Sequence, residues 1–205
     1  DKLEEAEKVL MDLLDIEKDD LQARTELAKI YQRQGKLGEA EKYLKQYIEL
    51  DNNGLHPRTE LAKIYQRQGK LEEAEKVLME SLRIDDKQLH PRTELAKIYQ
   101  RQGKLEEAEK VLLESLKIDD KDFYAMAELI SVYHKLLEVD KCLKIFDNFL
   151  IDVSLNKEKQ HQAMFNNIFK LCVRFARKEK AVEYFHKYSY ALDDRNIALY
   201  RQLFS

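Results

Sequence analysis

Apolar residues recur at three- and four-residue spacing along most of the chain, which predicts a series of amphipathic helices. In residues 55–68 the apolar stripe is formed by Leu61, Ala62, Ile64 and Tyr65. The stripe of residues 71–84 is formed by Leu71, Ala74, Val77, Leu78, Ser81 and Leu82. Ala62 and Ala74 are small, so we expect these two helices to approach each other closely.

The boundaries of these helices are predicted from proline, glycine and aspartate. Pro57 is expected at the first helical position, where a missing amide costs nothing, with His56 as the flanking cap residue; Pro91 and His90 repeat this arrangement. Gly69 and Gly103 follow a polar turn and suit the left-handed conformation that ends a helix. Carboxylates suit helix caps, so the pairs Asp85-Asp86 and Asp119-Asp120 are expected to cap the helices that follow them.

The helix pair is repeated along the chain. Residues 55–88 recur as residues 89–122 with 31 of 34 positions identical. A 34-residue period with helical patterning is typical of a solenoid of stacked helix pairs. We therefore predict an all-α, right-handed superhelical α-solenoid of antiparallel helix pairs, with roughly twelve helices in all.

Three regions follow from this period. Residues 1–16 match the second helix of a repeat whose first helix is missing, so the chain is expected to be a fragment, and this open helix could mediate end-to-end self-association. Residues 17–122 contain three near-consensus repeats, the first of which is expected to be softer because Gly38 stands where the later copies have Glu72 and Glu106. Residues 123–205 contain divergent repeats and a C-terminal helix.

The divergent region differs in composition. It holds all eight phenylalanines and both cysteines, Cys142 and Cys172, which occur in no metal or redox spacing and are expected to be buried thiols. Leu137 replaces the turn glycine. A core stripe is expected from the aromatic residues Phe165, Phe169, Phe175, Tyr184, Phe185, Tyr188 and Tyr190.

Charge and chemistry exclude several classes of function. The net charge of -3 indicates no general affinity for polyanions, although residues 1–122 carry 23 basic and 29 acidic residues and the remainder 13 and 10. No apolar run approaches the roughly 20 residues of a membrane span, and no signal peptide is present, so a cytoplasmic location is expected. Histidines and carboxylates form no metal or catalytic set, and no glycine-rich phosphate loop occurs. We predict a non-enzymatic protein with no cofactor and no metal.

From residue 21 to about residue 122 the chain resembles the tetratricopeptide repeat family. The resemblance rests on the spacing of Leu61-Ala62, Tyr65, Gly69, Leu71, Ala74, Leu78 and Leu82. Arg58 and Arg92 depart from it, where the family commonly has a large aromatic residue. The resemblance implies that the first helices of successive repeats line a groove that binds extended peptides. Some members grip a C-terminal carboxylate there, but Thr59 and Lys63 replace the Lys and Asn of that clamp, so a chaperone-tail adaptor is not expected.

Carried over by position, the groove would be lined by one row from each first helix: Gln22, Thr25, Lys29, Gln32 and Arg33; His56, Thr59, Lys63, Gln66 and Arg67; His90, Thr93, Lys97, Gln100 and Arg101. Stacked repeats would make a ladder of six cations, partly offset by nearby glutamates. This ladder predicts an acidic peptide as ligand, with Gln and Thr bonding its backbone. The alternative is that these charges only keep a duplicated array in solution.

The most direct functional prediction is a scaffold or adaptor module that binds a protein or peptide. Two alternatives remain open at this point. The chain could be a regulatory module of a larger enzyme, or it could bind single-stranded RNA through its basic, aromatic second half, which also has some similarity to pentatricopeptide repeats. We expect no membrane partner.

Overall fold

The computed structural model describes residues 2–150, 166, 169–170, 172–174, 177–188 and 193–204. Within these residues the chain is helical, with turns and no strand. The helices are α1 (Lys2–Ile16), α2 (Leu21–Arg33), α3 (Leu37–Leu50), α4 (Leu55–Gln68), α5 (Leu71–Ile84), α6 (Leu89–Gln102), α7 (Leu105–Ile118), α8 (Phe123–Leu136), α9 (Val139–Leu150), α11 (Lys178–Tyr188) and α12 (Asp194–Phe204). The predicted all-α class is confirmed.

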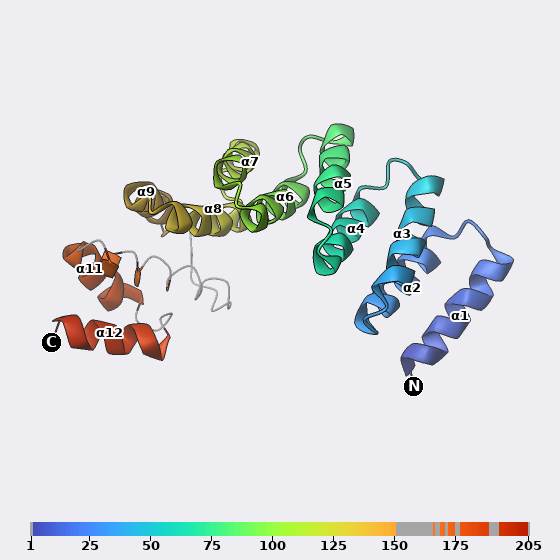
Figure 1. The fold of residues 1–205 in the computed structure, drawn as a ribbon, viewed down its shortest axis with the longest axis horizontal. Coiled ribbons are helices and arrows are strands. Elements are labelled where there is room, and N and C mark those ends of the chain that lie inside the picture. Colours follow the sequence, from blue (N-terminus) through green and yellow to red (C-terminus); the bar gives the residue numbers. More distant parts are fainter. Residues whose placement is uncertain are drawn as a thin grey trace. The chain divides into compact units, whose positions relative to one another are not determined.

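The chain divides into two compact units, Asp1–Ile98 and Tyr99–Ser205, and the division falls inside α6. In the first unit α2 packs on α3 and α4 packs on α5, so each first helix lies against its second helix (Figure 1). Packing between repeats joins α1 to α2 and α3 to α4. In the second unit α8 packs against both α7 and α9.

The predicted apolar stripes form the core of the first unit. Leu61, Ala62, Ile64 and Tyr65 of α4 are all buried, as are Ala74, Leu78 and Ser81 of α5. Small residues recur where the paired helices meet, with Ala28, Ala40, Ala62 and Ala74 at most 1% exposed. Each buried leucine contributes about 1.5–3 kcal/mol to stability, so this short repeated set supplies much of the favourable free energy of folding.

The first helices end as the glycines predict. Gly69 and Gly103 both have φ 77°, and the backbone amide of Gly69 donates to the carbonyls of Gln66 and Tyr65. Leu137 takes the same left-handed conformation after α8, with φ 61°. Among the described residues it is the one non-glycine residue with positive φ. A side chain in this conformation costs roughly 1–2 kcal/mol, so the turn geometry is kept against the residue's own preference.

The predicted starts of the first helices were wrong. α4 begins at Leu55 with Gly54 as its N-cap, so Pro57 is the third helical residue and not the first, and His56 lies inside the helix. Pro57 is still tolerated because the first four amides of a helix have no partner within it. Pro91 occupies the same third position of α6.

The aspartates expected to cap the next helix also act differently. Asp85 and Asp119 accept bonds from the amides of Lys87 and Lys121, two residues on, and so stabilise the turn after a second helix. Side-chain capping at α2 and α8 comes instead from the aspartate directly before the helix. Asp20 accepts from the amide of Ala23 at 2.8 Å, and Asp122 accepts from those of Tyr124 and Ala125.

Arg58, which departs from the family pattern, is buried. Its side chain is 1% exposed and donates to the carbonyl oxygen of Gly54 at 2.9 Å and to Oδ1 of Asn52 at 2.7 Å. Arg92 donates to the carbonyl oxygen of Gln88 at 2.9 Å. Each arginine therefore ties its first helix to the loop before it, in a position that an aromatic ring would otherwise fill.

A tyrosine–glutamate hydrogen bond joins neighbouring repeats at three positions. The hydroxyl of Tyr31 donates to Glu7 at 3.0 Å and that of Tyr65 to Glu41 at 3.2 Å. In the second unit Tyr133 donates to Glu109 at 3.0 Å. Lysines cover the same tyrosine rings, with Nζ 5.4–5.6 Å from the ring centroids for the pairs Lys36–Tyr31, Lys70–Tyr65 and Lys141–Tyr133.

Glu41 is the most heavily bonded of these carboxylates. It accepts from Lys45 at 2.7 Å, Gln68 at 3.2 Å and Lys70 at 3.4 Å, in addition to Tyr65. Burial opposes its charge, but the bonds from Lys45 and Gln68 outweigh burial and lower the pKa of Glu41 to about 2.

α1 is the least covered helix of the first unit. It contains no buried residue, and Val9, Met11 and Ile16 are 66%, 44% and 81% exposed. This agrees with the prediction that part of its apolar face is open. Self-association through this helix stays a prediction.

The second unit buries part of the predicted aromatic stripe. Phe169 is 1% exposed, and Phe185 stacks on Tyr200 with ring centroids 3.5 Å apart. Cys142 and Cys172 are both buried, as predicted. Phe165, Phe175 and Tyr190 lie outside the described residues. In the part of the chain that the structure describes, no helix has the length and apolar character of a membrane span.

Gly38→Ala should stabilise the protein. Gly38 lies in the first turn of α3, and a methyl group there would meet no atom within 4 Å. Removing the entropic cost of glycine should add up to about 1 kcal/mol. Gly69→Ala is the matched control, because its positive φ makes the same change destabilising by roughly 1–2 kcal/mol. Urea midpoints measure both, and a lower midpoint for Gly38→Ala would contradict the prediction.

Glu41→Gln should make the stability of the fold less sensitive to pH in the acid range. The folded-state pKa of Glu41 is about 2, below the ordinary 4.5, so its charge stabilises the fold above about pH 4.5. That contribution is lost as the pH falls toward about 2. Thermal midpoints measured across this range should fall less for Glu41→Gln than for the unmodified chain. Glu49→Gln, on the exposed face of the same helix, should leave the slope unchanged.

Candidate functional site

The predicted groove residues of the first unit lie on α2, α4 and α6. We call Lys29, Arg33, His56, Lys63, Gln66, Arg67, His90 and Lys97 the first-helix row. Three members of the row are half-buried, namely Lys63, Gln66 and Lys97. The other five are exposed: Lys29, Arg33, His56, Arg67 and His90. Equivalent members are 34 residues apart in sequence, so successive helices present the same side chain at the same helical position.

The three lysines of the row are ion-paired within their own helices. Lys29 lies 2.7 Å from Glu26, and Lys63 and Lys97 each lie 2.9 Å from Glu60 and Glu94. The glutamate side chains become less exposed along the row, at 46%, 18% and 8%. Three of the six cations of the predicted ladder are therefore neutralised within their own helices. The sequence had predicted only a partial offset by nearby glutamates.

Hydrogen bonds also link one repeat to the next within the row. Gln66 donates to Glu94 at 3.1 Å, and Gln32 bonds Glu60 in the same way. Burial opposes the charge on both glutamates, but the bonds and charges of Lys63 and Lys97 outweigh it and lower the pKa of each carboxyl. Both carboxylates therefore stay ionised at neutral pH.

The threonines are not available as predicted. Thr59 and Thr93 are each 3% exposed, and their hydroxyls donate to the carbonyl oxygens of Leu55 and Leu89 at 3.3 and 3.2 Å. Thr25 makes the same bond to Leu21 at 2.9 Å. These hydroxyls serve their own helices, so the expectation that they bond a peptide backbone was wrong in its geometry.

The arginines of the row differ from the lysines. Arg33 and Arg67 are exposed, and the part of the chain that the structure describes provides neither with an ion-pair partner. His90 lies among charges of both signs. Partial burial and the charges of Lys63 and Lys97 lower its pKa against the opposing effect of Glu94.

Two predicted groove residues belong to the second unit. Gln100 donates to Glu128 at 2.8 Å and accepts from Lys135 at 2.7 Å. Arg101 is exposed. Gln100 therefore continues the glutamine–glutamate bonding that Gln66 shows in the first unit.

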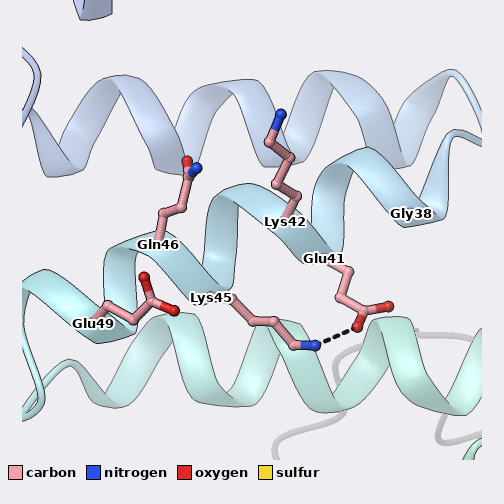
Figure 2. Close-up of a pocket in the computed structure, with 6 residues that line it drawn as sticks. All are labelled: Gly38, Glu41, Lys42, Lys45, Gln46 and Glu49. Atoms are coloured by element: carbon pink, nitrogen blue, oxygen red, sulfur yellow. Dashed lines mark hydrogen bonds and ion pairs between the residues drawn. The ribbon is translucent and has the colours of Figure 1, made fainter.

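A polar hollow lies on the surface of α3. It has a volume of about 490 Å³ and is lined by Gly38, Glu41, Lys42, Lys45, Gln46 and Glu49. In Figure 2, Lys42 and Gln46 point to one side of the helix, while Lys45 points to the other and reaches Glu41. Every lining residue comes from one helix, so the hollow is a surface feature of the first repeat.

The hollow was not predicted from the sequence, although the first two repeats differ at several of its lining positions. Gly38, Lys45 and Gln46 stand where the next repeat has Glu72, Met79 and Glu80. Gly38 opens the space because it lacks the side chain that the later copies carry.

No group of three or more His, Cys, Asp and Glu side chains suited to a metal ion occurs among the described residues. Burial raises the pKa of the Cys142 thiol to about 12, so the sulfur is protonated at neutral pH and is a poor nucleophile.

Replacing a lysine of the row should destabilise the protein more when the glutamate paired with that lysine is more deeply buried. Lys97→Met leaves a carboxylate that is 8% exposed without its counter-ion, which should cost about 1–3 kcal/mol. Lys29→Met is the matched control, because its partner is 46% exposed and such surface pairs contribute less than about 1 kcal/mol. Lys63→Met should fall between them. Equal shifts of the urea midpoint for all three would contradict this order.

Solved structures with this fold cover most of the chain. A tetratricopeptide repeat protein from Parabacteroides merdae covers 93% of this chain and 74% of its own, with 17% identity and a TM-score of 0.74. PilF of Pseudomonas aeruginosa covers 91% and 82% with 17% identity and a TM-score of 0.71. YrrB, described as a TPR protein with an unusual peptide-binding site, covers 94% and 97% with 16% identity and a TM-score of 0.67. At this identity the similarity concerns the fold.

Comparison with curated protein sequences finds no match. Two family models described as Tetratricopeptide repeat match residues 1–55 and 55–121. These ranges contain the helix pairs, turn glycines and buried alanines described above, and together they cover more than half of the sequence. The chain belongs to the tetratricopeptide repeat family.

Proposed function

We propose that the chain is a protein-interaction module that binds an extended, acidic segment of a partner protein on the first-helix row of the first unit. Membership of a family of interaction modules supports this proposal at the level of class. The observation that carries the choice of surface is the exposure of Arg33 and Arg67 at the same position of successive first helices. Neither has a carboxylate partner among the described residues.

The row is suited to recognition because half of its side chains are already held in place. Ion pairs fix Lys63 and Lys97, and the bond from Gln66 to Glu94 ties neighbouring repeats together. A surface that is ordered before binding loses less side-chain entropy when a ligand arrives. The guanidinium groups then supply the uncompensated charge and can bond a carboxylate with two parallel hydrogen bonds.

This proposal narrows the ligand-contacting set that the sequence predicts. Arg33, Arg67, His56, His90 and Lys29 are the exposed members, and Lys29 is already paired with Glu26. The other four can meet a ligand directly, while the lysines contribute mainly through their pairs. A role as regulatory module of a larger enzyme is compatible with the same surface, because such a module also acts by binding a protein segment. A non-enzymatic role and a cytoplasmic location stay predictions.

Charge reversal at Arg33 and Arg67 tests the proposed surface. The probe is a fluorescent peptide rich in glutamate and aspartate, and fluorescence anisotropy measures its binding at low and physiological salt. Each exposed charge contact contributes about 0.2–1 kcal/mol, so Arg33→Glu/Arg67→Glu should weaken binding about tenfold or more once repulsion is added. A peptide with Gln and Asn in place of the acids should bind weakly to every variant.

The matched control is Lys8→Glu/Lys76→Glu, which makes the same change of charge at two exposed positions of second helices. It should bind the acidic peptide like the unmodified chain. Equal weakening by the two pairs would show that only net charge matters. The proposed surface would be abandoned in that case, and also if neither pair changed the affinity.

A further inference from the structure

Each second helix of the first unit ends in an exposed aliphatic residue. Ile16, Leu50 and Ile84 are the last residues of α1, α3 and α5, and successive members are 34 residues apart. They are 81%, 46% and 39% exposed. Figure 1 shows that α1, α3 and α5 end at one edge of this unit, where α2 and α4 begin. We call this edge, formed by residues 15–20, 49–54 and 83–88, the turn edge.

The turns after α3 and α5 have the same hydrogen bonds. The amides of Asp51 and Asp85 each donate to the carbonyl oxygen four residues before, at 2.9 and 3.1 Å. Their side chains each accept from the amide two residues on, at 3.0 Å. Because both turns are fixed in the same way, Leu50 and Ile84 are presented at equivalent places along the turn edge.

The turn edge is strongly acidic. It contains eight acidic and three basic residues, a net charge of -5, whereas the whole chain has a net charge of -3. Among the described residues, no side chain of the edge takes part in an ion pair. The exposed carboxylates beside the aliphatic residues are those of Asp15, Glu17, Asp19, Glu49 and Asp86.

The combination of aliphatic residues and carboxylates at the turn edge points to a binding surface. A single exposed aliphatic residue is common on protein surfaces and needs no explanation. Here one such residue recurs at every turn of the unit, and covering the row would remove apolar area from water. Carboxylates without a counter-ion attract cations and repel acidic partners. The edge therefore offers apolar contact area together with a charge that selects a basic ligand.

We propose that the turn edge of the first unit binds a basic amphipathic helix of a partner protein. The complementary surface is a stripe of aliphatic side chains flanked by lysine or arginine, which one face of such a helix presents. Arg33 is the last residue of α2, a helix of 13 residues that starts at the turn edge, so it lies about 18 Å away along the helix. The site is separate from the first-helix row and goes beyond the function proposed above.

Two other occupants suit the turn edge less well. Membrane surfaces that carry anionic lipids have a negative potential, so the carboxylates of the edge would be repelled. A second copy of the chain has a net charge of -3 itself, so charge opposes its approach to this edge. A basic helix has neither of these disadvantages.

The test measures the binding of labelled peptides to the whole chain by fluorescence anisotropy. One helical peptide presents a leucine stripe flanked by lysines, and matched peptides have glutamine in place of leucine or glutamate in place of lysine. The lysine–leucine peptide should bind most tightly, and Leu50→Ser/Ile84→Ser should weaken its binding at least about tenfold. Val9→Ser/Met79→Ser is the matched control, because these residues are 66% and 41% exposed outside the edge.

A second pair of variants tests the charge of the edge without removing an apolar contact. Glu49→Gln/Asp86→Asn should weaken binding of the lysine–leucine peptide and make it less sensitive to salt. Glu39→Gln/Glu73→Gln also removes two carboxylates, but from the first turns of α3 and α5, at the other ends of these helices. This control should bind the peptide like the unmodified chain.

Circular dichroism checks the folding of each variant. Equal weakening by an edge pair and its control, or equally tight binding of the lysine–glutamine peptide, would overturn the proposed surface. Self-association in sedimentation that only Leu50→Ser/Ile84→Ser abolishes would identify a second copy and overturn the choice of partner. No binding of the lysine–leucine peptide would overturn the proposal itself. Arg33→Glu/Arg67→Glu should not weaken this binding, so the result is independent of the first-helix row.

Discussion

The contact between a tyrosine of one repeat and a glutamate of the repeat before it is the interaction on which the stack depends. A solenoid repeat buries its apolar face only against its neighbours, so no distant part of the chain corrects an error in register. The hydroxyls of Tyr31, Tyr65 and Tyr133 reach the preceding second helix at 3.0–3.2 Å. Because each tyrosine is also in the apolar core, one side chain fixes the depth of packing and the alignment of neighbouring repeats.

The same use of local pairing shapes the surface. On the first helices of the first unit, Glu60 and Glu94 neutralise the lysines that follow them and accept bonds from the previous repeat. This network leaves Arg33 and Arg67 as the main uncompensated charges of the row. In the second unit Lys135 donates instead to the amide oxygen of Gln100, which is neutral. Recognition is therefore expected where the repeated pairing is incomplete.

Several features could be predicted because they depend on short-range sterics. Ala62 and Leu61 are buried at the predicted positions, and Gly69 has the left-handed conformation that its place after a polar turn indicates. The start of α4 could not be predicted in the same way. Proline is acceptable anywhere in the first turn, so Pro57 alone does not identify the first helical residue, and the caps depend on the loop that approaches the helix.

The sequence by itself determined the repeat length, the buried stripe of each helix and the family, because these follow from spacing along one helix. Tertiary structure decided how exposed each charged side chain is, and so how much its ion pair contributes to stability. Glu26, Glu60 and Glu94 stand in the same local sequence, Thr-Glu-Leu-Ala-Lys, yet their side chains are 46%, 18% and 8% exposed. The exposure of a side chain, and with it the strength of its ion pair, is set by the neighbouring helix and not by its own segment.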